Sequence, residues 1–163
     1  MKFKYELGPQ AVIPTINAYP GMDAGVLDSV AEKANAIIIV VFANGGSPQI
    51  LNPSIKKITE NGVPIFLVSD NAGAEHGITR VFDQTQIESA KAGAIFIEKA
   101  NINNLSEISK FIQQEFAQGK SGSELGESVR EHFSYKEGEQ KPVMEWEDPA
   151  TMKNKDKSVF DKE

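Results

Sequence analysis

Two short loops could bind a small ligand, because each follows a predicted strand and precedes a predicted helix. The first loop, 17–23, contains a proline, a glycine and an aspartate, and the second loop reads Asn44-Gly45-Gly46-Ser47-Pro48. The free N–H groups and the dipole of a helix N-terminus favour an anion, such as the carboxylate of a small amino acid. Any strand-to-helix connection needs similar turn residues, so a purely structural role stays open for both loops.

The histidines and serines offer weaker candidates for chemistry. His76 lies in a polar loop, 70–86, and a metal site there would need several converging ligands. The acidic residues near it in the sequence are Glu75, Asp83 and Glu88. The chain has no HxH or HExxH spacing, so we predict an ordinary exposed histidine, no metal site and no cofactor. No nucleophile motif surrounds Ser69, and His132 lies among charged residues, so we predict no catalytic residue.

The elements that would position these loops alternate along the chain. Apolar runs rich in β-branched residues predict strands at 11–16, 36–43, 64–69 and 94–97. Helical spacing of apolar residues predicts helices between the strands, including a short one at 86–92, and two more after the last strand. This order predicts a three-layer, Rossmann-like α/β fold with about four parallel strands and helices on both faces.

Local signals predict where the helices begin and end. Asp23 is an expected N-cap, and Ser47-Pro48 is expected to start the next helix, with Ile50 in its buried apolar stripe. Asn61-Gly62 is expected to end that helix. Asn104, followed three residues later by a glutamate, is expected to form a capping box.

Composition limits the classes of function. The chain has 163 residues, a net charge of −6 and no cysteine. An acidic chain is a poor match for nucleic acid or an anionic membrane surface. The absence of cysteine excludes disulfides and thiolate metal sites. The N-terminus has no apolar signal-peptide core, and the longest apolar run, 36–43, is far shorter than the roughly 20 residues of a membrane span. We therefore predict a cytoplasmic protein.

The last part of the chain differs in composition from the rest. Residues 136–163 have few aliphatic side chains and no periodicity, which predicts a disordered or extended acidic tail after an α/β domain of residues 1–135. The only tryptophan, Trp146, lies in this tail between two glutamates. Such an aromatic residue could dock in a partner's groove or fold back onto its own domain, and both interpretations stay open.

Several motifs follow one another in a specific order. They are Ala18-Tyr19-Pro20-Gly21-Met22-Asp23, Ala43-Asn44-Gly45-Gly46-Ser47-Pro48, Asn61-Gly62-Val63-Pro64-Ile65-Phe66-Leu67-Val68-Ser69 and Ala90-Lys91-Ala92-Gly93-Ala94-Ile95. Over roughly residues 10–133, this series resembles the C-terminal domain of type I L-asparaginases and glutaminase-asparaginases. A related subunit of the archaeal glutamyl-tRNA amidotransferase shares that domain. The resemblance implies a small four-stranded parallel domain that normally accompanies a large catalytic domain.

The resemblance also implies which chemistry this chain lacks. The family's nucleophile is a threonine in a glycine-rich motif, and it works with a second threonine, an aspartate and a lysine, all in the large domain. Neither threonine motif occurs in this sequence. Covalent amide hydrolysis needs an activated nucleophile, so we do not expect the chain to be active alone.

The family's small domain builds an intimate dimer and lends polar side chains to the neighbouring subunit's active site. By this resemblance, the substrate-binding residues would be Asn44, Gly45, Gly46, Gln86 and Glu88. Two positions depart from the family pattern: Gly46 stands where a substrate-facing amide usually lies, and Gln86 stands near an expected acidic residue. Ser69-Asp70 likewise replaces the family's serine-arginine. These departures favour a domain that keeps the fold and has lost, or handed over, the chemistry.

Three functions are compatible with these observations. The first is the dimerising, site-completing half of an asparagine or glutamine amidohydrolase, acting as a homo-oligomer or with a separate catalytic subunit. The second is a non-catalytic interaction module with a partner-binding C-terminal tail. The third is a sensor that binds a small molecule such as an amino acid at the strand ends.

Overall fold

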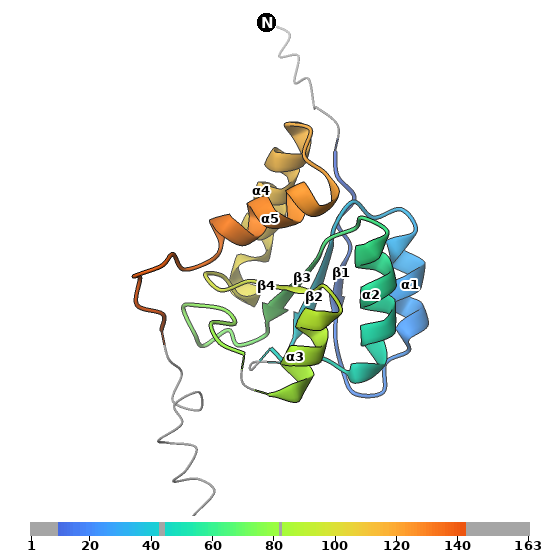
Figure 1. Cartoon of the computed structure of the whole chain (residues 1–163), viewed down its shortest axis with the longest axis horizontal. Helices are drawn as coiled ribbons and strands as arrows, with labels where there is room; N and C mark the ends of the chain where they lie inside the picture. The colour runs from blue at the N-terminus through green and yellow to red at the C-terminus, as the bar shows by residue number, and fades with distance from the viewer. Residues whose placement is uncertain (1–9, 43–44, 82, 143–163) are drawn as a thin grey trace, which may run out of the picture.

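The computed structural model describes residues 10–42, 45–81 and 83–142. Its elements are β1 (Thr15–Asn17), α1 (Ala24–Ala31), β2 (Ile37–Val41), η1 (Gln49–Leu51), α2 (Asn52–Glu60), β3 (Ile65–Ser69), α3 (Gln84–Lys91), β4 (Ile95–Phe96), η2 (Ile102–Asn104), α4 (Leu105–Ala117) and α5 (Gly122–His132). Helices and strands alternate as far as β4, and two helices follow it (Figure 1). The predicted α/β order is confirmed.

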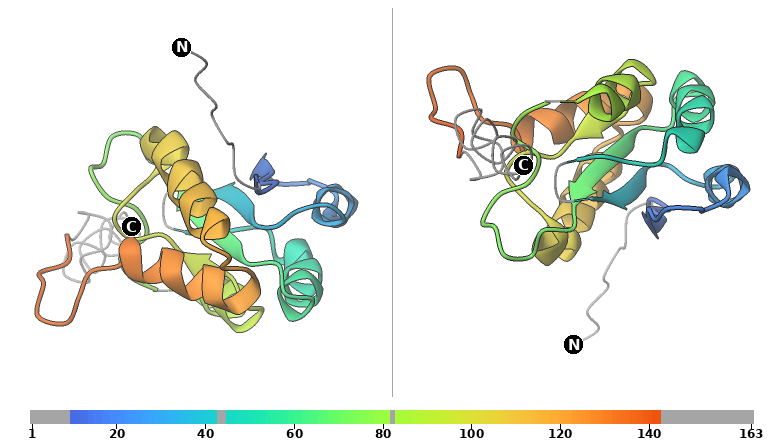
Figure 2. Two further views of the ribbon diagram at one scale, coloured as in Figure 1. Left: turned by 90° about the horizontal axis from the view of Figure 1, so that it is seen from above. Right: turned by 90° about the horizontal axis from the view of Figure 1, so that it is seen from below.

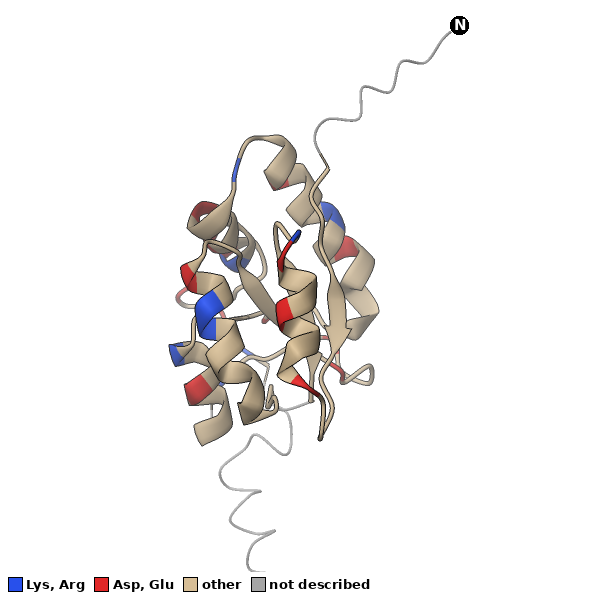
Figure 3. Cartoon of the chain, turned by 90° about the vertical axis from the view of Figure 1, so that its right-hand side faces the viewer, with Lys and Arg blue, Asp and Glu red and all other residues tan. Residues whose placement is uncertain are grey.

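The four strands form one parallel sheet in the order β1-β2-β3-β4. The central strands β2 and β3 are aligned over their full length, with Ile38 opposite Phe66, and every residue of both strands is buried. This double burial explains why β2 reads as a continuous apolar run and does not alternate. None of the four described strands carries a charged residue, and the charges of the described residues lie on helices and loops (Figure 3).

Each face of the sheet has its own hydrophobic core. On one face, α1, α2 and α3 cover alternate sheet residues such as Ile39 and Leu67. On the other face, α4 and α5 cover Ile38 and Phe66 (Figure 2). The two cores use neighbouring residues of the same strand, because successive side chains point to opposite faces. The prediction of helices on both faces is confirmed.

The helix ends follow their local signals in part. The Asp23 side chain caps α1 by accepting a hydrogen bond from the Gly25 N–H at 2.8 Å. Gly62, with φ of 88°, follows the C-cap of α2, as predicted. The expected start at Ser47-Pro48 is wrong. Pro48 is the N-cap of the short 3-10 helix η1, no side chain caps that helix, and α2 begins only at Asn52.

This 3-10 turn also changes what is buried. Helical spacing places Ile50 in the buried stripe, but Ile50 is 61% exposed, whereas Leu51 is fully buried. The tighter turn rotates successive side chains by a different angle from an α-helix, so only one of the two residues faces the core. The Asn104 capping box is also displaced. The Asn104 side chain accepts a hydrogen bond from the Asn101 N–H at 3.1 Å and caps η2 together with Asn101.

The outer strands are shorter than predicted. β1 begins after Pro14, which has no N–H to donate to the ladder. Beside β4, the N–H groups of Gly77 and Ile78 donate to the carbonyls of Glu98 and Ile97 at 2.7 and 2.9 Å. The loop after β3 is therefore tied to the chain just after β4. Within the described residues, no helix has the length and hydropathy needed to cross a bilayer.

Candidate functional site

The loops that leave the strands converge at one edge of the sheet, because all four strands are parallel. This carboxyl edge lies at the bottom of Figure 1 and faces the viewer in the right panel of Figure 2. In open parallel sheets, ligands gather at this edge. It carries the residues that come after β1, β2 and β3, including both predicted loops.

The loop after β2 packs directly against the start of α3. Gly45 has a φ of 84°, and a Cβ atom there would lie 2.9 Å from both Gln86 Nε2 and Ile78 Cγ2. The Gly45 N–H donates to the Phe42 carbonyl at 2.7 Å, which closes the turn. Glycine is therefore required here twice, once for its backbone angle and once for the close approach of the helix.

Gln86 is fully buried and acts as a structural clamp. Its side-chain carbonyl accepts a hydrogen bond from the Asp83 N–H at 3.2 Å, and the Asp83 carboxylate accepts one from the Gln86 N–H at 2.9 Å. The Gln86 amide also donates to the Arg80 carbonyl at 3.1 Å. This capping box starts α3 at Gln84, two residues before the predicted start at 86. Both ends of the Gln86 amide group thus hold the backbone.

A buried serine pair ties the loop after β2 to two helices. The Ser47 and Ser89 hydroxyls lie 3.1 Å apart, and both side chains are buried. Ser89 also donates to Asn52 Oδ1 at 3.2 Å or to the Thr85 carbonyl at 3.0 Å. Buried hydroxyls need such partners, so Ser47 fixes the loop from inside and does not cap a helix.

The predicted substrate-binding residues divide into three groups. Gly45, Gly46 and Gln86 lie together at the carboxyl edge, joined through the contact of Gly45 with Gln86. Glu88 does not join them. Its side chain is 40% exposed and lies 3.9 Å from Lys91 on the same helix. Asn44 lies outside the described residues. The assignment of these residues to substrate binding stays a prediction.

His76 is not the exposed histidine that the sequence predicts. Only 8% of its surface is exposed, and its Nδ1 lies 2.9 Å from the Gly77 carbonyl. Asn101 donates to the His76 carbonyl at 3.1 Å and to the Ala74 carbonyl at 2.7 Å. These bonds order the loop after β3 and explain the burial. Among the described residues, no three His, Asp or Glu side chains are grouped as metal ligands would be.

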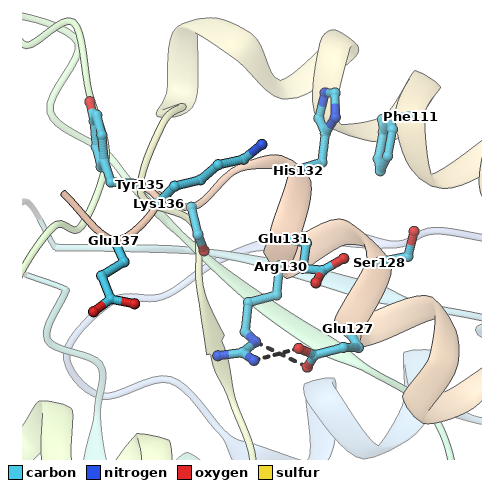
Figure 4. Close-up of a pocket in the computed structure, with 10 residues that line it drawn as sticks. Phe111, Glu127, Ser128, Arg130, Glu131, His132, Tyr135, Lys136 and Glu137 are labelled. Atoms are coloured by element: carbon cyan, nitrogen blue, oxygen red, sulfur yellow. Dashed lines mark hydrogen bonds and ion pairs between the residues drawn. The ribbon is translucent and has the colours of Figure 1, made fainter. Parts of the chain in front are cut away.

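Away from the carboxyl edge, a surface pocket of about 610 Å³ lies at the C-terminal end of α5 (Figure 4). Phe111 and His132 stack in its wall with ring centroids 3.8 Å apart, and Arg130 pairs with Glu127. The sequence alone predicts no site here, although Glu127 and Arg130 have the spacing of a helical ion pair. The pocket is lined by both acidic and basic side chains, so its charge does not favour one class of ligand.

Close to this pocket, a polar cluster joins α4 to α5. The Glu115 carboxylate accepts hydrogen bonds from Lys120 Nζ and, at 2.9 Å, from the Ser128 hydroxyl. The bond from Lys120, followed by the one from Ser128, lowers the pKa of Glu115 below its usual value, although partial burial acts in the opposite direction. The Glu115 side chain is only 12% exposed, so we regard the cluster as a structural link between the helices.

Comparison with known proteins bears on the fold. No protein-family model and no curated protein matches this sequence. Many solved structures do match it, including two L-asparaginases. L-asparaginase I from Vibrio cholerae O1 biovar eltor matches with a TM-score of 0.64 and 23% identity, over 81% of this chain and 38% of the enzyme chain. The thermostable L-asparaginase from Thermococcus kodakarensis matches with a TM-score of 0.63 and 16% identity, over 78% and 38%.

This chain has the fold of one part of an L-asparaginase. It spans about 38% of the length of these two enzymes, which is consistent with the predicted C-terminal domain. The resemblance inferred from the motif order is therefore confirmed at the level of the fold. At such low identity, the match carries no information about which side chains act on a substrate.

Proposed function

We propose that this chain is the small, site-completing half of an asparaginase-type amidohydrolase, which hydrolyses the side-chain amide of asparagine or glutamine. One observation carries the proposal. The asparaginase fold likeness covers about four fifths of this chain but only 38% of each enzyme. A chain with this fold and without the threonine motifs needs a nucleophile from elsewhere, either from a separate polypeptide or from another part of a longer protein.

In this role, the chain contributes its carboxyl edge to a composite site. Contacts of Gly45, Ser47 and Gln86 hold the described part of the loop after β2, and fixed placement is what a residue lent to another subunit's active site needs. The substrate is a small amino acid, whose carboxylate would be favoured at a helix N-terminus on this edge. We propose no cofactor, because amide hydrolysis by an activated hydroxyl needs none.

Ammonia release from asparagine and glutamine tests the proposal. The chain should be co-expressed with a polypeptide that carries the threonine motifs, and each half should also be assayed alone. We expect activity from the pair and none from this chain alone. Gly45→Ala should lower the paired activity and Gly62→Ala should spare it, because both glycines have a positive φ but only a Cβ at Gly45 would meet Gln86 and Ile78. A pair that binds without any ammonia release would contradict the proposal.

A second role as a non-catalytic interaction module has its own support. Two large apolar side chains that follow strand ends are exposed to solvent, Tyr19 after β1 and Ile50 after β2, with exposed fractions of 54% and 61%. Exposed apolar side chains at the same edge of a sheet can mark a protein interface. Stable binding of a protein partner that lacks the threonine motifs, with no ammonia release, would favour this role.

A further inference from the structure

A groove of about 400 Å³ lies beside β4, next to the loop after β3. Its lining residues are Ile78, Thr79, Arg80, Val81, Phe96, Glu98 and Lys141. Val81 is 48% exposed in the wall of this groove, although its neighbours Ile78 and Thr79 are buried. No described residue covers the Val81 side chain fully, so an apolar surface is left open at this point.

The chain itself leads into this groove after α5. The Glu98 carboxylate accepts a hydrogen bond from the Tyr135 N–H at 2.7 Å and one from Lys141 Nζ at 2.8 Å. Further along, the Thr79 hydroxyl donates to the Pro142 carbonyl at 3.1 Å. Pro142 is the last described residue before the C-terminal segment. That segment therefore starts at the rim of the groove.

A second set of contacts holds the same stretch of chain. Lys99 Nζ lies 3.1 Å from the Glu139 carboxylate and 5.0 Å from the centre of the Tyr135 ring. Together with Glu98, these contacts fix residues 135–142 at both ends. A chain held in this way delivers its next residues to a defined place on the surface.

The residues after Pro142 are chemically complementary to the groove, because they combine apolar and acidic side chains and the groove contains apolar and basic ones. Residues 143–147 read Val-Met-Glu-Trp-Glu. At roughly 3.3–3.6 Å per residue, the Trp146 α-carbon can lie no more than about 14 Å from that of Pro142. Within the described ranges, no carboxylate forms an ion pair with Arg80, which is exposed at the groove. The two glutamates beside Trp146 supply such carboxylates.

We propose that residues 143–147 dock in this groove of their own domain, with Trp146 packed against Val81 and Phe96 and with the flanking glutamates beside Arg80. Tryptophan is enriched among the residues that dominate binding at protein interfaces, and its ring also attracts a nearby guanidinium. Attachment through only a few residues gives the segment a millimolar effective concentration at this groove. It therefore reaches its own groove before a dilute partner can bind it. This contact forms whether or not the chain takes part in amide hydrolysis.

Tryptophan fluorescence tests the proposal directly, because Trp146 is the only tryptophan in the chain. We expect emission from the native full-length chain to be blue-shifted, and its quenching by acrylamide to be several-fold weaker than in the denaturant-unfolded chain. Val81→Asp and Arg80→Glu should each raise the quenching towards the unfolded value. Val12→Asp is the matched control, because Val12 is equally exposed, at 49%, and precedes β1 on the opposite side of the sheet.

Three results would overturn the proposal. The first is a native Trp146 as accessible to acrylamide as the unfolded one. The second is an equal change in the acrylamide quenching of Trp146 in Val81→Asp and Val12→Asp, when circular dichroism shows that both variants are folded. The third is a loss of the shielding of Trp146 from acrylamide when the protein is diluted, which would show that Trp146 binds the groove of a second copy of the chain.

Discussion

At the residue scale, the contact between Gly45 and Gln86 decides the shape of the candidate site. We predict that Gly45→Ala lowers the free energy of unfolding by about 2–5 kcal/mol. The left-handed backbone alone costs roughly 1–2 kcal/mol with any side chain, and forcing a methyl group against Gln86 and Ile78 adds roughly 1–3 kcal/mol. Urea unfolding of the variant measures this loss.

Gly62 provides the matched comparison for this prediction. It has a φ of 88°, close to that of Gly45, but no atom lies within 4 Å of an added Cβ. Gly62→Ala should therefore lose only the backbone part, roughly 1–2 kcal/mol. Equal losses in the two variants would show that the loop after β2 is not packed against α3.

Single residues are the hardest part of the site to predict from the sequence. The family resemblance assigns Gln86 to substrate, yet the pattern Asp83-x-x-Gln86 is itself a capping signal. That signal points to the role the structure shows, in which Gln86 holds the helix start. The predictions for His76 and Ser47 fail for another reason. Their surroundings depend on tertiary contacts, of Asn101 with the His76 carbonyl and of Ser89 with Ser47, which local patterns do not contain.

At the scale of elements, the link between α4 and α5 should respond to acid. The pKa of Glu115 is lowered in the folded state, chiefly by Lys120. The stabilisation is therefore fully present above the ordinary value of 4.5 and is lost as the pH falls through the lower folded-state pKa. We predict that Glu115→Gln costs about 1–2 kcal/mol of unfolding free energy at pH 6, since two hydrogen bonds to a charged group are weakened.

The pH dependence separates this link from a general effect of charge. The stability difference between the parent chain and Glu115→Gln should shrink as the pH is lowered from 6 to 3 in equilibrium unfolding experiments. Glu60→Gln, at an exposed glutamate at the end of α2, should show little difference at either pH. A Glu115→Gln penalty that stays constant down to pH 3 would argue against a lowered Glu115 pKa.

The strands and helices are largely predictable because their signals are long and consistent. The run at β2 is buried on both faces, and its continuous β-branched residues are typical of a central strand in a parallel sheet. The first and last strands are shorter than their apolar runs predict, since some apolar residues of each run lie outside the hydrogen-bonded strand. Ile50 shows the limit of helical periodicity. A local 3-10 turn moves an apolar residue out of the core without changing the sequence pattern.

At the scale of the whole molecule, the exposed apolar groups on the carboxyl edge predict self-association. We expect light scattering after size-exclusion chromatography to show an oligomer, and Ile50→Asp to convert it to a monomer, because a buried charge without a partner is costly at an interface. Val12→Asp changes an equally apolar residue before β1 and should leave the oligomer intact. A monomeric parent chain would remove this edge as a self-association surface.

The described side chains around the candidate loop are engaged in structural contacts. Gly45 packs against Gln86, the Ser47 hydroxyl lies next to that of Ser89, and the Gln86 amide donates to the Arg80 carbonyl. Ser69, at the end of β3, is 1% exposed, and its hydroxyl accepts a hydrogen bond from the Asn71 N–H at 3.2 Å. No described hydroxyl is paired with a histidine in the way an activated nucleophile requires.

The most direct test is ammonia release from asparagine by this chain alone, purified to homogeneity and assayed at high concentration over several hours. The account predicts a rate equal to the buffer blank, because the chain carries the scaffold without an activated nucleophile. Ammonia release that rises in proportion to the chain concentration and persists through successive purification steps would contradict it.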